Sequence, residues 1–369
     1  MITLGNEVIA KLDELIRYGK SHEARAFIKK IKIRNSNLAL LPKLCHILTR
    51  SGMAKKTILI LRPYVQPEIL SHKKATEEIK AEYALALTQV GATPEAIELF
   101  KKINYTSAPK GLLYHAIALF TQWDYAAATP LLYKYLQTPR LSDYEILVGK
   151  VNLAAAYIDQ QKYSEAEKLL ENLLSVTKKN DFKLLYGNCL ELSVQLATNK
   201  KDYISAKKSL ALANESLENG PQKYQLMVAK WQAITDFGAS PKSKTNIKAL
   251  ANVKQKAIKM GHWETVRDFD FYQDYFTQDS ALYLKVYFGT PQAAYRLRLK
   301  RLYKSNIELP ENYSWNPTGE QRQKDHVIDA QMGKDLRSGA TLKFDSNSYR
   351  LFLILASDFY LPYRVESLF

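Results

Sequence analysis

Residues that build covalent, metal or nucleotide chemistry are scarce in this sequence. The two cysteines, Cys45 and Cys189, occupy apolar positions of helical patterns, so we expect small buried side chains and no disulfide framework. The six histidines are far apart, and no HExxH or CxxC spacing occurs. GxGxxG and GxxxxGK loops are also missing. We therefore expect no cofactor, no metal and no enzymatic activity.

One group of carboxylates needs a separate comment, because carboxylate oxygens suit hard cations. The group consists of Glu264, Asp268, Asp270 and Asp274. Aromatic residues are interleaved with these carboxylates, as in an ordinary amphipathic helix. That pattern favours a helix over a metal site.

Long apolar runs are missing as well. The longest obvious one, residues 351–356, is far shorter than the roughly 20 residues needed to cross a bilayer. Glu7, Asp13 and Glu14 interrupt the amino-terminal segment, which therefore lacks the apolar centre of a signal peptide. We expect a cytoplasmic protein without membrane association.

Acidic side chains are outnumbered by basic ones, 37 to 53, which gives a net charge of +16. A basic surface attracts nucleic acid through its phosphates. The lysines, however, are scattered over the solvent faces of nearly every predicted helix, as the solubility of an extended helical protein also requires. The net charge leaves both explanations open.

What the sequence does contain is an amphipathic helical hairpin, clearest in residues 151–174. The first helix carries Ala154 and Tyr157 on one face, and the second carries Ala166 and Leu170 at helical spacing. The alanines are small where two helices approach closely, and the larger side chains fill the gaps beside them. Such a hairpin cannot bury its apolar face alone, so it needs neighbouring copies.

Those copies are found when Ala166 is taken as the reference position of the repeat, which we call the anchor. Five further anchors give successive spacings of 33, 39, 32, 38 and 40 residues; they are Ala24, Thr57, Ala96, Ala128 and Ala206. The positions 12 and 9 residues before each anchor, and 4 and 7 residues after it, are apolar in all six units. Five residues before the anchor, the first three units have Gly19, Gly52 and Gly91, which relieve the backbone at a helix end.

This pattern resembles tetratricopeptide (TPR) repeats, which are helix-turn-helix units of about 34 residues. The resemblance covers residues 1–217. The chain departs from the family in its variable period, in Thr57 at one anchor and in lacking the usual Trp early in each first helix. Spacings near 40 residues resemble the longer-helix variants of bacterial regulatory proteins. The resemblance implies an all-α fold, a right-handed α-solenoid of helical hairpins, and protein binding.

In TPR proteins the first helices line a groove, which implies where a ligand would bind. One such helix has a polar stripe made of Asn188, Glu191, Gln195 and Asn199, and His46 and Arg50 occupy a comparable place near the amino end. Rigidly held polar groups of this kind can hydrogen-bond a protein, an extended peptide or a small effector. A solvated concave face without a particular ligand is the alternative, and both stay open.

Residues 218–307 keep the helical periodicity, and we expect divergent repeats that end the solenoid. Helices are predicted over 224–237, 245–260 and 263–276, followed by a basic helix from 290 to about 304. One explanation of the basic side chains is contact with nucleic-acid phosphates, and the other is a solvated outer face. These side chains are Arg296, Arg298, Lys300, Arg301 and Lys304.

The last part of the chain differs in kind. Residues 308–325 contain helix-breaking prolines and a glycine and are predicted to be a linker. In residues 326–369, short strands at 327–329 and 341–344 precede a helix, and a second helix starts after Pro362. This order resembles the opening of a winged-helix domain, a small α+β fold. The helix that reads DNA in that family would lie beyond Phe369, so we expect this chain to be a fragment of a longer regulator.

Two functional hypotheses follow. In the first, the chain is an intracellular bacterial regulator in which the TPR solenoid binds a protein, a peptide or a small effector and controls a carboxy-terminal winged-helix DNA-binding domain in transcription regulation. In the second, it is a scaffold or adaptor without a nucleic-acid role, and residues 326–369 only cap the solenoid. The sequence leaves the oligomeric state open, a homo-oligomer included.

Overall fold

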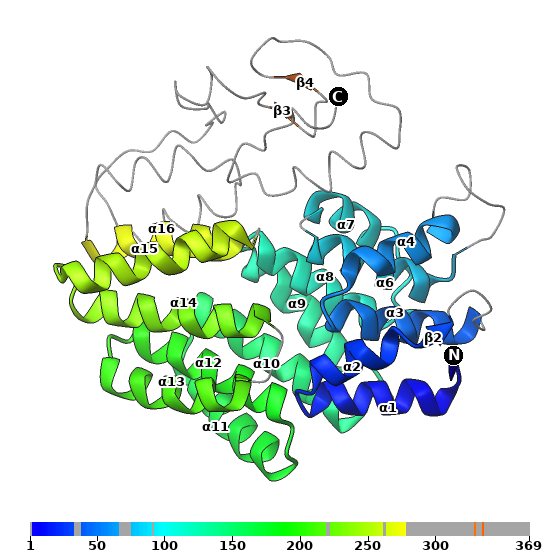
Figure 1. Cartoon of the computed structure of the whole chain (residues 1–369), viewed down its shortest axis with the longest axis horizontal. Coiled ribbons are helices and arrows are strands. Elements are labelled where there is room, and N and C mark those ends of the chain that lie inside the picture. The colour runs from blue at the N-terminus through cyan, green and yellow to red at the C-terminus, as the bar shows by residue number, and fades with distance from the viewer. Residues whose placement is uncertain are drawn as a thin grey trace.

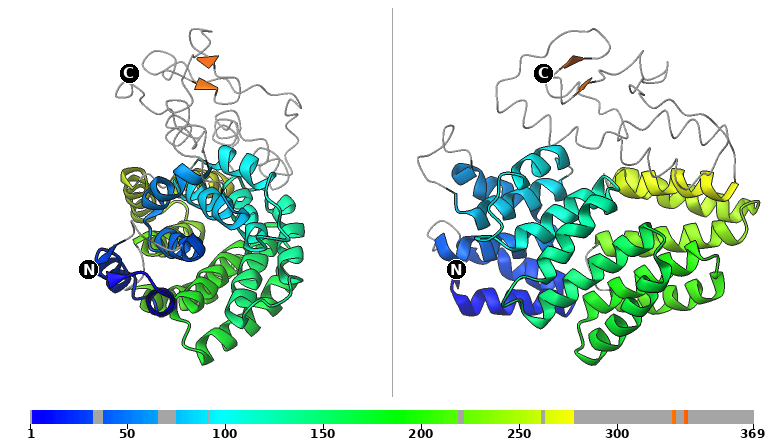
Figure 2. Two further views of the ribbon diagram at one scale, coloured as in Figure 1. Left: turned by 90° about the vertical axis from the view of Figure 1, so that its right-hand side faces the viewer. Right: turned by 180° about the vertical axis from the view of Figure 1, so that it is seen from behind.

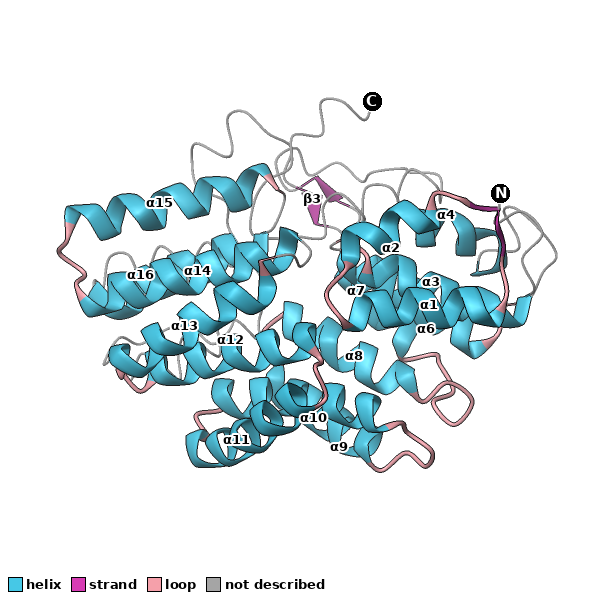
Figure 3. Cartoon of the chain, turned by 60° about the horizontal axis from the view of Figure 1, so that its bottom comes forward, coloured by secondary structure: helices cyan, strands magenta, loops and turns pink. Residues whose placement is uncertain are grey.

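Helices joined by short loops make up almost all of the part of the chain that the structure describes (Figure 3). The computed structural model describes residues 2–32, 38–65, 75–90, 92–218, 222–260, 263–277, 328–329 and 334–335. The α-helices are α1 (Asn6–Arg17), α2 (Ser21–Ile28), α3 (Leu41–Arg50), α4 (Ala54–Val65), α6 (Glu77–Gln89), α7 (Thr93–Phe100), α8 (Lys110–Thr121), α9 (Tyr125–Leu136), α10 (Asp143–Asp159), α11 (Tyr163–Lys179), α12 (Lys183–Asn199), α13 (Tyr203–Leu217), α14 (Gln222–Ala239), α15 (Lys244–Lys259) and α16 (Trp263–Thr277). A short 3-10 helix, η1 (Leu38–Leu40), precedes α3.

Consecutive helices pack as hairpins, and the hairpins stack side by side (Figure 1). The paired helices are α1–α2, α3–α4, α6–α7, α8–α9, α10–α11, α12–α13 and α14–α15. Most first helices also contact the next first helix, as α10 contacts α12 and α12 contacts α14. The predicted all-α solenoid is therefore confirmed for the described residues, and it continues through the helices predicted after the sixth unit.

The small residues on which the repeat was built lie where the helices cross. All six anchors, from Ala24 to Ala206, have no exposed surface. The same holds for the residues 12 positions earlier on the facing helix, such as Ala154 opposite Ala166. Large side chains pack beside each crossing, and Leu170 is 2% exposed. The small residues of the repeat therefore mark the positions where the helices pack together. A larger side chain at a buried crossing would push the helices apart.

The turn between the two helices of a unit uses a left-handed backbone conformation. Gly19 and Gly52 have φ angles of 77° and 76°. In later units the same position, five residues before the anchor, has φ near 60° in Trp123, Gln161 and Lys201. The turn geometry is therefore shared by the units, although only the early ones use glycine, the residue that adopts it most readily.

The row of hairpins curves so strongly that α1 contacts α12 (Figure 2). Two side-chain contacts also join units far apart in sequence. Arg50 of α3 donates a hydrogen bond to the hydroxyl of Tyr144 at the start of α10. The ring of Trp123 meets the ring of Phe271 edge-on, with centroids 5.2 Å apart. The solenoid therefore closes on itself.

Short strands appear where the sequence did not predict them. β1 (Ile2–Thr3) pairs in parallel with β2 (Ile31–Lys32). Ile31 was predicted on the second helix of the first unit, but α2 ends at Ile28 and Ile31 is in this strand pair. Its side chain is still buried, because the strand brings it to the same core as the end of α2.

Little of the carboxy-terminal prediction falls on described residues. β3 (Ile328–Asp329) lies within the strand predicted at 327–329. It pairs antiparallel with β4 (Lys334–Asp335), which the pattern did not predict. The basic helix, the linker at 308–325, the strand at 341–344 and the helices after it lie outside the described residues. In the described part of the chain, no helix combines the length and apolarity needed to span a membrane.

Candidate functional site

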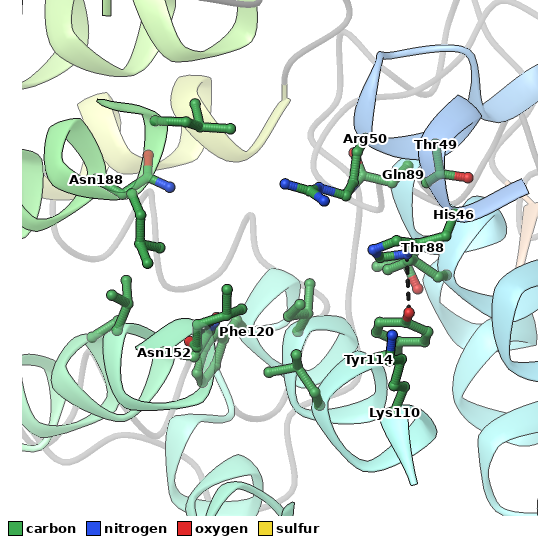
Figure 4. Close-up of a pocket in the computed structure, with 18 of the residues that line it drawn as sticks. His46, Thr49, Arg50, Thr88, Gln89, Lys110, Tyr114, Phe120, Asn152 and Asn188 are labelled. Atoms are coloured by element: carbon green, nitrogen blue, oxygen red, sulfur yellow. Dashed lines mark hydrogen bonds between the residues drawn. The ribbon is translucent and has the colours of Figure 1, made fainter. Parts of the chain in front are cut away.

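The curved row of hairpins encloses a cavity of about 1560 Å³. Most of the cavity wall comes from the first helices of the hairpins. The lining residues recur every three or four positions, so each helix presents one stripe to the cavity. On α12 this stripe includes Asn188, Gln195 and Asn199, and on α6 it includes Leu85 and Thr88. Figure 4 shows Arg50 and Asn188 reaching toward the same space from opposite sides.

All six side chains predicted to line the groove lie on this cavity wall; they are His46, Arg50, Asn188, Glu191, Gln195 and Asn199. His46 and Arg50 come from α3, and the other four come from α12. The curvature of the solenoid therefore brings together two stripes about 140 residues apart in the sequence. That a ligand binds to them stays a prediction.

Arg50 is held by contacts to two other helices. Its Nη1 donates to Asp13 Oδ1 of α1 at 2.9 Å, and its Nη2 donates to the Tyr144 hydroxyl at 3.2 Å. Arg17 Nη2 contacts the second oxygen of Asp13 at 2.6 Å and lies over the Tyr144 ring. Burial acts to lower the pKa of Arg50, but Tyr144 and Asp13 outweigh it and the pKa is raised. The guanidinium stays charged at the wall.

His46 belongs to a second polar cluster, with Glu82 of α6 and Tyr114 of α8. The Tyr114 hydroxyl donates to Glu82 Oε1 at 2.8 Å and lies 3.0 Å from His46 Nδ1 (Figure 4). His46 Nδ1 is also 3.4 Å from Glu82 Oε2. Burial, and then the charge of Glu82, raise the pKa of Tyr114 well above its ordinary value. Tyr114 is therefore a neutral donor that fixes the carboxylate.

The stripe on α12 continues into a third cluster, formed with α14 and α16. Gln195 Nε2 donates to Glu191 Oε1 at 2.7 Å. Close by, Lys230 Nζ donates to Asp268 Oδ2 at 2.8 Å. Burial raises the pKa of Glu191, and the charge of Lys230 opposes that rise. This end of the wall therefore combines two carboxylates with one ammonium group.

Between the charged clusters, two asparagine side chains face the cavity. Asn152 Nδ2 on α10 donates to its own helix, at the carbonyl of Val148, 2.8 Å away. The amide of Asn188 makes no hydrogen bond to any described residue. Both side chains are only partly buried, and Figure 4 shows them on the same side of the cavity. They offer amide donors and acceptors to a molecule inside.

Comparison with known proteins bears on the hairpin α10–α11. Residues 150–179 match the family model described as Tetratricopeptide repeat. The chain contains a TPR repeat. The match falls on the hairpin whose pattern defines the other five units, and no match to a curated protein was found. TPR repeats generally bind protein partners, and the cavity is the surface on which this chain's TPR-like first helices converge.

Several residues of the site were not singled out from the sequence. Tyr114 and Glu82 lie on predicted first helices, and their three-to-four-residue spacing from other cavity-lining positions could have indicated them. Tyr144 lies before the helix predicted from residue 151, because α10 begins at Asp143. Lys230 and Asp268 belong to the more divergent units. The pairing of these side chains depends on how the hairpins stack, which the pattern of one repeat does not contain.

Two of the carboxylates of α16 pair with lysines. Asp268 pairs with Lys230, and Asp270 pairs with Lys254 of α15. Among the described residues, no group of three or more His, Cys, Asp or Glu side chains is arranged to hold a metal ion. The predicted nucleic-acid contacts, Arg296, Arg298, Lys300, Arg301 and Lys304, lie outside the described residues.

Proposed function

We propose that this chain is a peptide-binding receptor module, in which the cavity of the TPR solenoid holds an extended segment of a partner. The observation that carries the proposal is the convergence of polar stripes from α3, α6, α8, α10 and α12 on one cavity. Amides, hydroxyls and charged groups on rigid helices can satisfy the backbone of an extended peptide, which otherwise loses its hydrogen bonds to water. Binding, rather than catalysis, is the role proposed for these groups.

The size of the cavity supports a peptide over a small effector. Pockets for drug-sized molecules are typically about 300–1000 Å³. The cavity here is about 1560 Å³, and its wall alternates apolar groups such as Leu113, Ile117 and Phe120 with polar ones. A segment of several residues would use both kinds of contact, whereas a small metabolite would leave much of the wall in water.

Affinity selection from a synthetic library of random heptapeptides tests the proposal. The protein is incubated with the soluble library, and retained peptides are identified by mass spectrometry and titrated calorimetrically. In the variant N152A/N188A, each lost amide is expected to weaken binding by about tenfold or less. The matched control is N214A, because Asn214 is exposed on the outer helix α13.

The expected result is retention of defined peptides by the wild type and N214A, with much weaker binding by N152A/N188A at an unchanged melting temperature. If no peptide is retained by the wild type, the proposal is wrong. It is also wrong if N152A/N188A, correctly folded, binds the selected peptides as tightly as the control.

A finer proposal concerns what peptide binding controls. The order of sequence segments supports regulation of a carboxy-terminal winged-helix DNA-binding domain, as in the first hypothesis. Its test is DNA binding by the full gene product, whose affinity should fall steeply with salt because phosphate contacts release counterions. An adaptor without a nucleic-acid role predicts instead that partner recovery survives nuclease treatment.

A further inference from the structure

One histidine of the cavity wall has a ring nitrogen to which no described residue is hydrogen-bonded. His46 lies on α3, and its ring stacks on that of Tyr114, with centroids 5.7 Å apart and planes at 19°. Its Nδ1 is 3.0 Å from the Tyr114 hydroxyl and 3.4 Å from Glu82 Oε2. Its Nε2 makes no hydrogen bond within the described part of the chain. Figure 4 shows the ring extending from α3 into the cavity.

The hydrogen bonds of Tyr114 determine which nitrogen of His46 carries the proton. A tyrosine hydroxyl has one proton to donate, and that of Tyr114 goes to Glu82 Oε1, 2.8 Å away. Burial and the charge of Glu82 raise the pKa of Tyr114, so the hydroxyl keeps this proton. Toward His46 the hydroxyl oxygen can therefore only accept, and Nδ1 must be the donor. In a neutral imidazole the other nitrogen, Nε2, is then an acceptor.

Glu82 orients this chain of hydrogen bonds. The residue is 5% exposed, and its Oε2 accepts no hydrogen bond from a described residue. A buried carboxylate needs donors, so the Tyr114 proton is directed at it, and His46 Nδ1 lies beside its second oxygen. Without the carboxylate, the Tyr114 proton would be free to turn to Nδ1, and the ring would carry its own proton on Nε2. Glu82 and Tyr114 are therefore positioning residues, and Nε2 is the group presented to an occupant.

The acceptor on His46 is accompanied by donors on the same helix. Arg50 lies one helical turn after His46, about 6 Å along the axis of α3. Its guanidinium bonds Asp13 and Tyr144, and its other N–H groups make no hydrogen bond to a described residue. An extended peptide presents an N–H and a C=O to the same side at every second residue, a repeat of about 6.6 Å. A backbone N–H can thus meet His46 while a carbonyl meets Arg50.

We propose that His46 Nε2 accepts a hydrogen bond from a backbone N–H of the bound peptide, and that Glu82 acts through Tyr114 to keep Nε2 unprotonated. This rests on the proposed function and deepens it, because it names the peptide group and the atom that recognises it. A residue without a backbone N–H, such as proline, is disfavoured at that position of the peptide, because Nε2 would lose its partner.

The state of the ring can be measured without any ligand. Isotope-labelled histidine is incorporated into the whole protein, and the ring nitrogens of His46 are assigned by comparison with H46F. NMR spectra are recorded well above the midpoint of the His46 titration, so that the ring is neutral. The expected result is a proton on Nδ1 and none on Nε2. In E82M, which replaces the carboxylate by an apolar side chain of similar length, the proton should be on Nε2.

A wild-type ring protonated on Nε2 would overturn the proposal, and so would a tautomer that is unchanged in folded E82M. The wild-type spectrum decides even if E82M does not fold. A purely structural role of Glu82 would change the melting temperature of E82M but not the position of the proton on His46.

The contact with the peptide is tested by an ester scan. A peptide selected from the heptapeptide library is synthesised with each backbone amide replaced in turn by an ester, which removes one N–H. Each form is titrated calorimetrically against the wild type, H46F and the control H22F, since His22 is exposed on α2. At one position the ester should weaken binding to the wild type and to H22F by about threefold to tenfold. This loss should disappear in H46F.

The outcomes of the scan separate this contact from the proposed function. If every ester has the same effect on H46F as on the wild type, the His46 contact is wrong and peptide binding by the cavity stands. If the wild type retains no peptide from the library, the proposed function is wrong, and the contact that rests on it is wrong as well.

Discussion

Single residues show which features of this fold a sequence pattern can report. The anchors were predictable because a small residue recurs at the helix crossing of every repeat. All six anchors are fully buried. The left-handed turn was predictable only where glycine occupies it. Gln161 and Lys201 adopt the same φ region although neither is a glycine. Their backbone strain therefore could not be predicted from the sequence.

The turn position gives a prediction that isolates backbone conformation from packing. Gly19 has a φ of 77°, and a Cβ added there meets nothing within 4 Å. We expect G19A to lower the free energy of unfolding by about 1 kcal/mol, because alanine disfavours this region. In the control N214A, alanine enters an exposed position inside the helix α13, so no such loss is expected. Urea denaturation measures both, and equal stabilities would contradict the explanation.

Glu145 provides a prediction about pH. Burial opposes ionisation, but the hydrogen bonds from Lys110 and Ser142 prevail and lower its pKa to about 2. Since the folded-state pKa lies below the unfolded value, the carboxylate stabilises the protein above the unfolded pKa. That contribution is lost as the pH falls toward 2. E145Q should therefore be less stable than the wild type at pH 7, by about 1 kcal/mol as for a lost helix cap.

The difference between E145Q and the wild type should shrink as the pH is lowered below about 4.5, the ordinary value for glutamate. Urea denaturation across that range measures it. The matched control is E98Q, because the pair of Glu98 with Lys101 is exposed and exposed pairs contribute little. A pH-independent difference would show that the ionised form of Glu145 is not what stabilises the capped helix.

At the scale of elements, helix positions followed from periodicity, whereas the cap at the start of α10 was not predicted. Ser142 and Glu145 form a reciprocal capping box at the start of α10. The parallel pair β1–β2 was not predictable, because two-residue strands leave no alternation to detect. Close approach of neighbouring helices was also hidden, since a glycine inside a helical pattern does not say what lies against it.

Gly187 is such a case, and it gives an element-scale prediction. A Cβ added at this position of α12 would lie 2.5 Å from side-chain atoms of Leu217 at the end of α13. Alanine in a helix is normally favourable over glycine by about 1 kcal/mol. Here we expect G187A to destabilise the protein by about 1–3 kcal/mol, as overpacking does. The double variant G187A/L217A should recover part of that loss in a double-mutant cycle, and strict additivity would contradict the explanation.

At the scale of the molecule, the sequence predicted a solenoid and residues of its inner face. It did not predict the contacts between hairpins that are far apart in the sequence. Arg50 and Tyr144 are 94 residues apart. Such pairs depend on the summed curvature of several units, and a variable period does not determine that curvature. The six predicted residues line the cavity, whereas the contact of Arg50 with Tyr144 could not be predicted.

The contribution of this closure can be measured with a mild substitution. Y144F removes the hydroxyl that accepts a hydrogen bond from Arg50, while the ring under Arg17 is kept. We expect a loss of about 1 kcal/mol in the free energy of unfolding. Y133F is the control, because the Tyr133–Tyr157 hydrogen bond is exposed and joins neighbouring units. Equal effects of the two variants would show that closure adds no stability of its own.

The most direct test of the account is to locate a bound peptide by photo-crosslinking. A peptide selected from the library is synthesised with a photoreactive phenylalanine analogue, irradiated in complex with the whole protein, and its attachment sites are mapped by mass spectrometry. The account predicts attachment to the cavity stripes of α3, α6, α8, α10 and α12. Attachment confined to exposed positions of the outer helices α9, α11, α13 and α15 would contradict it.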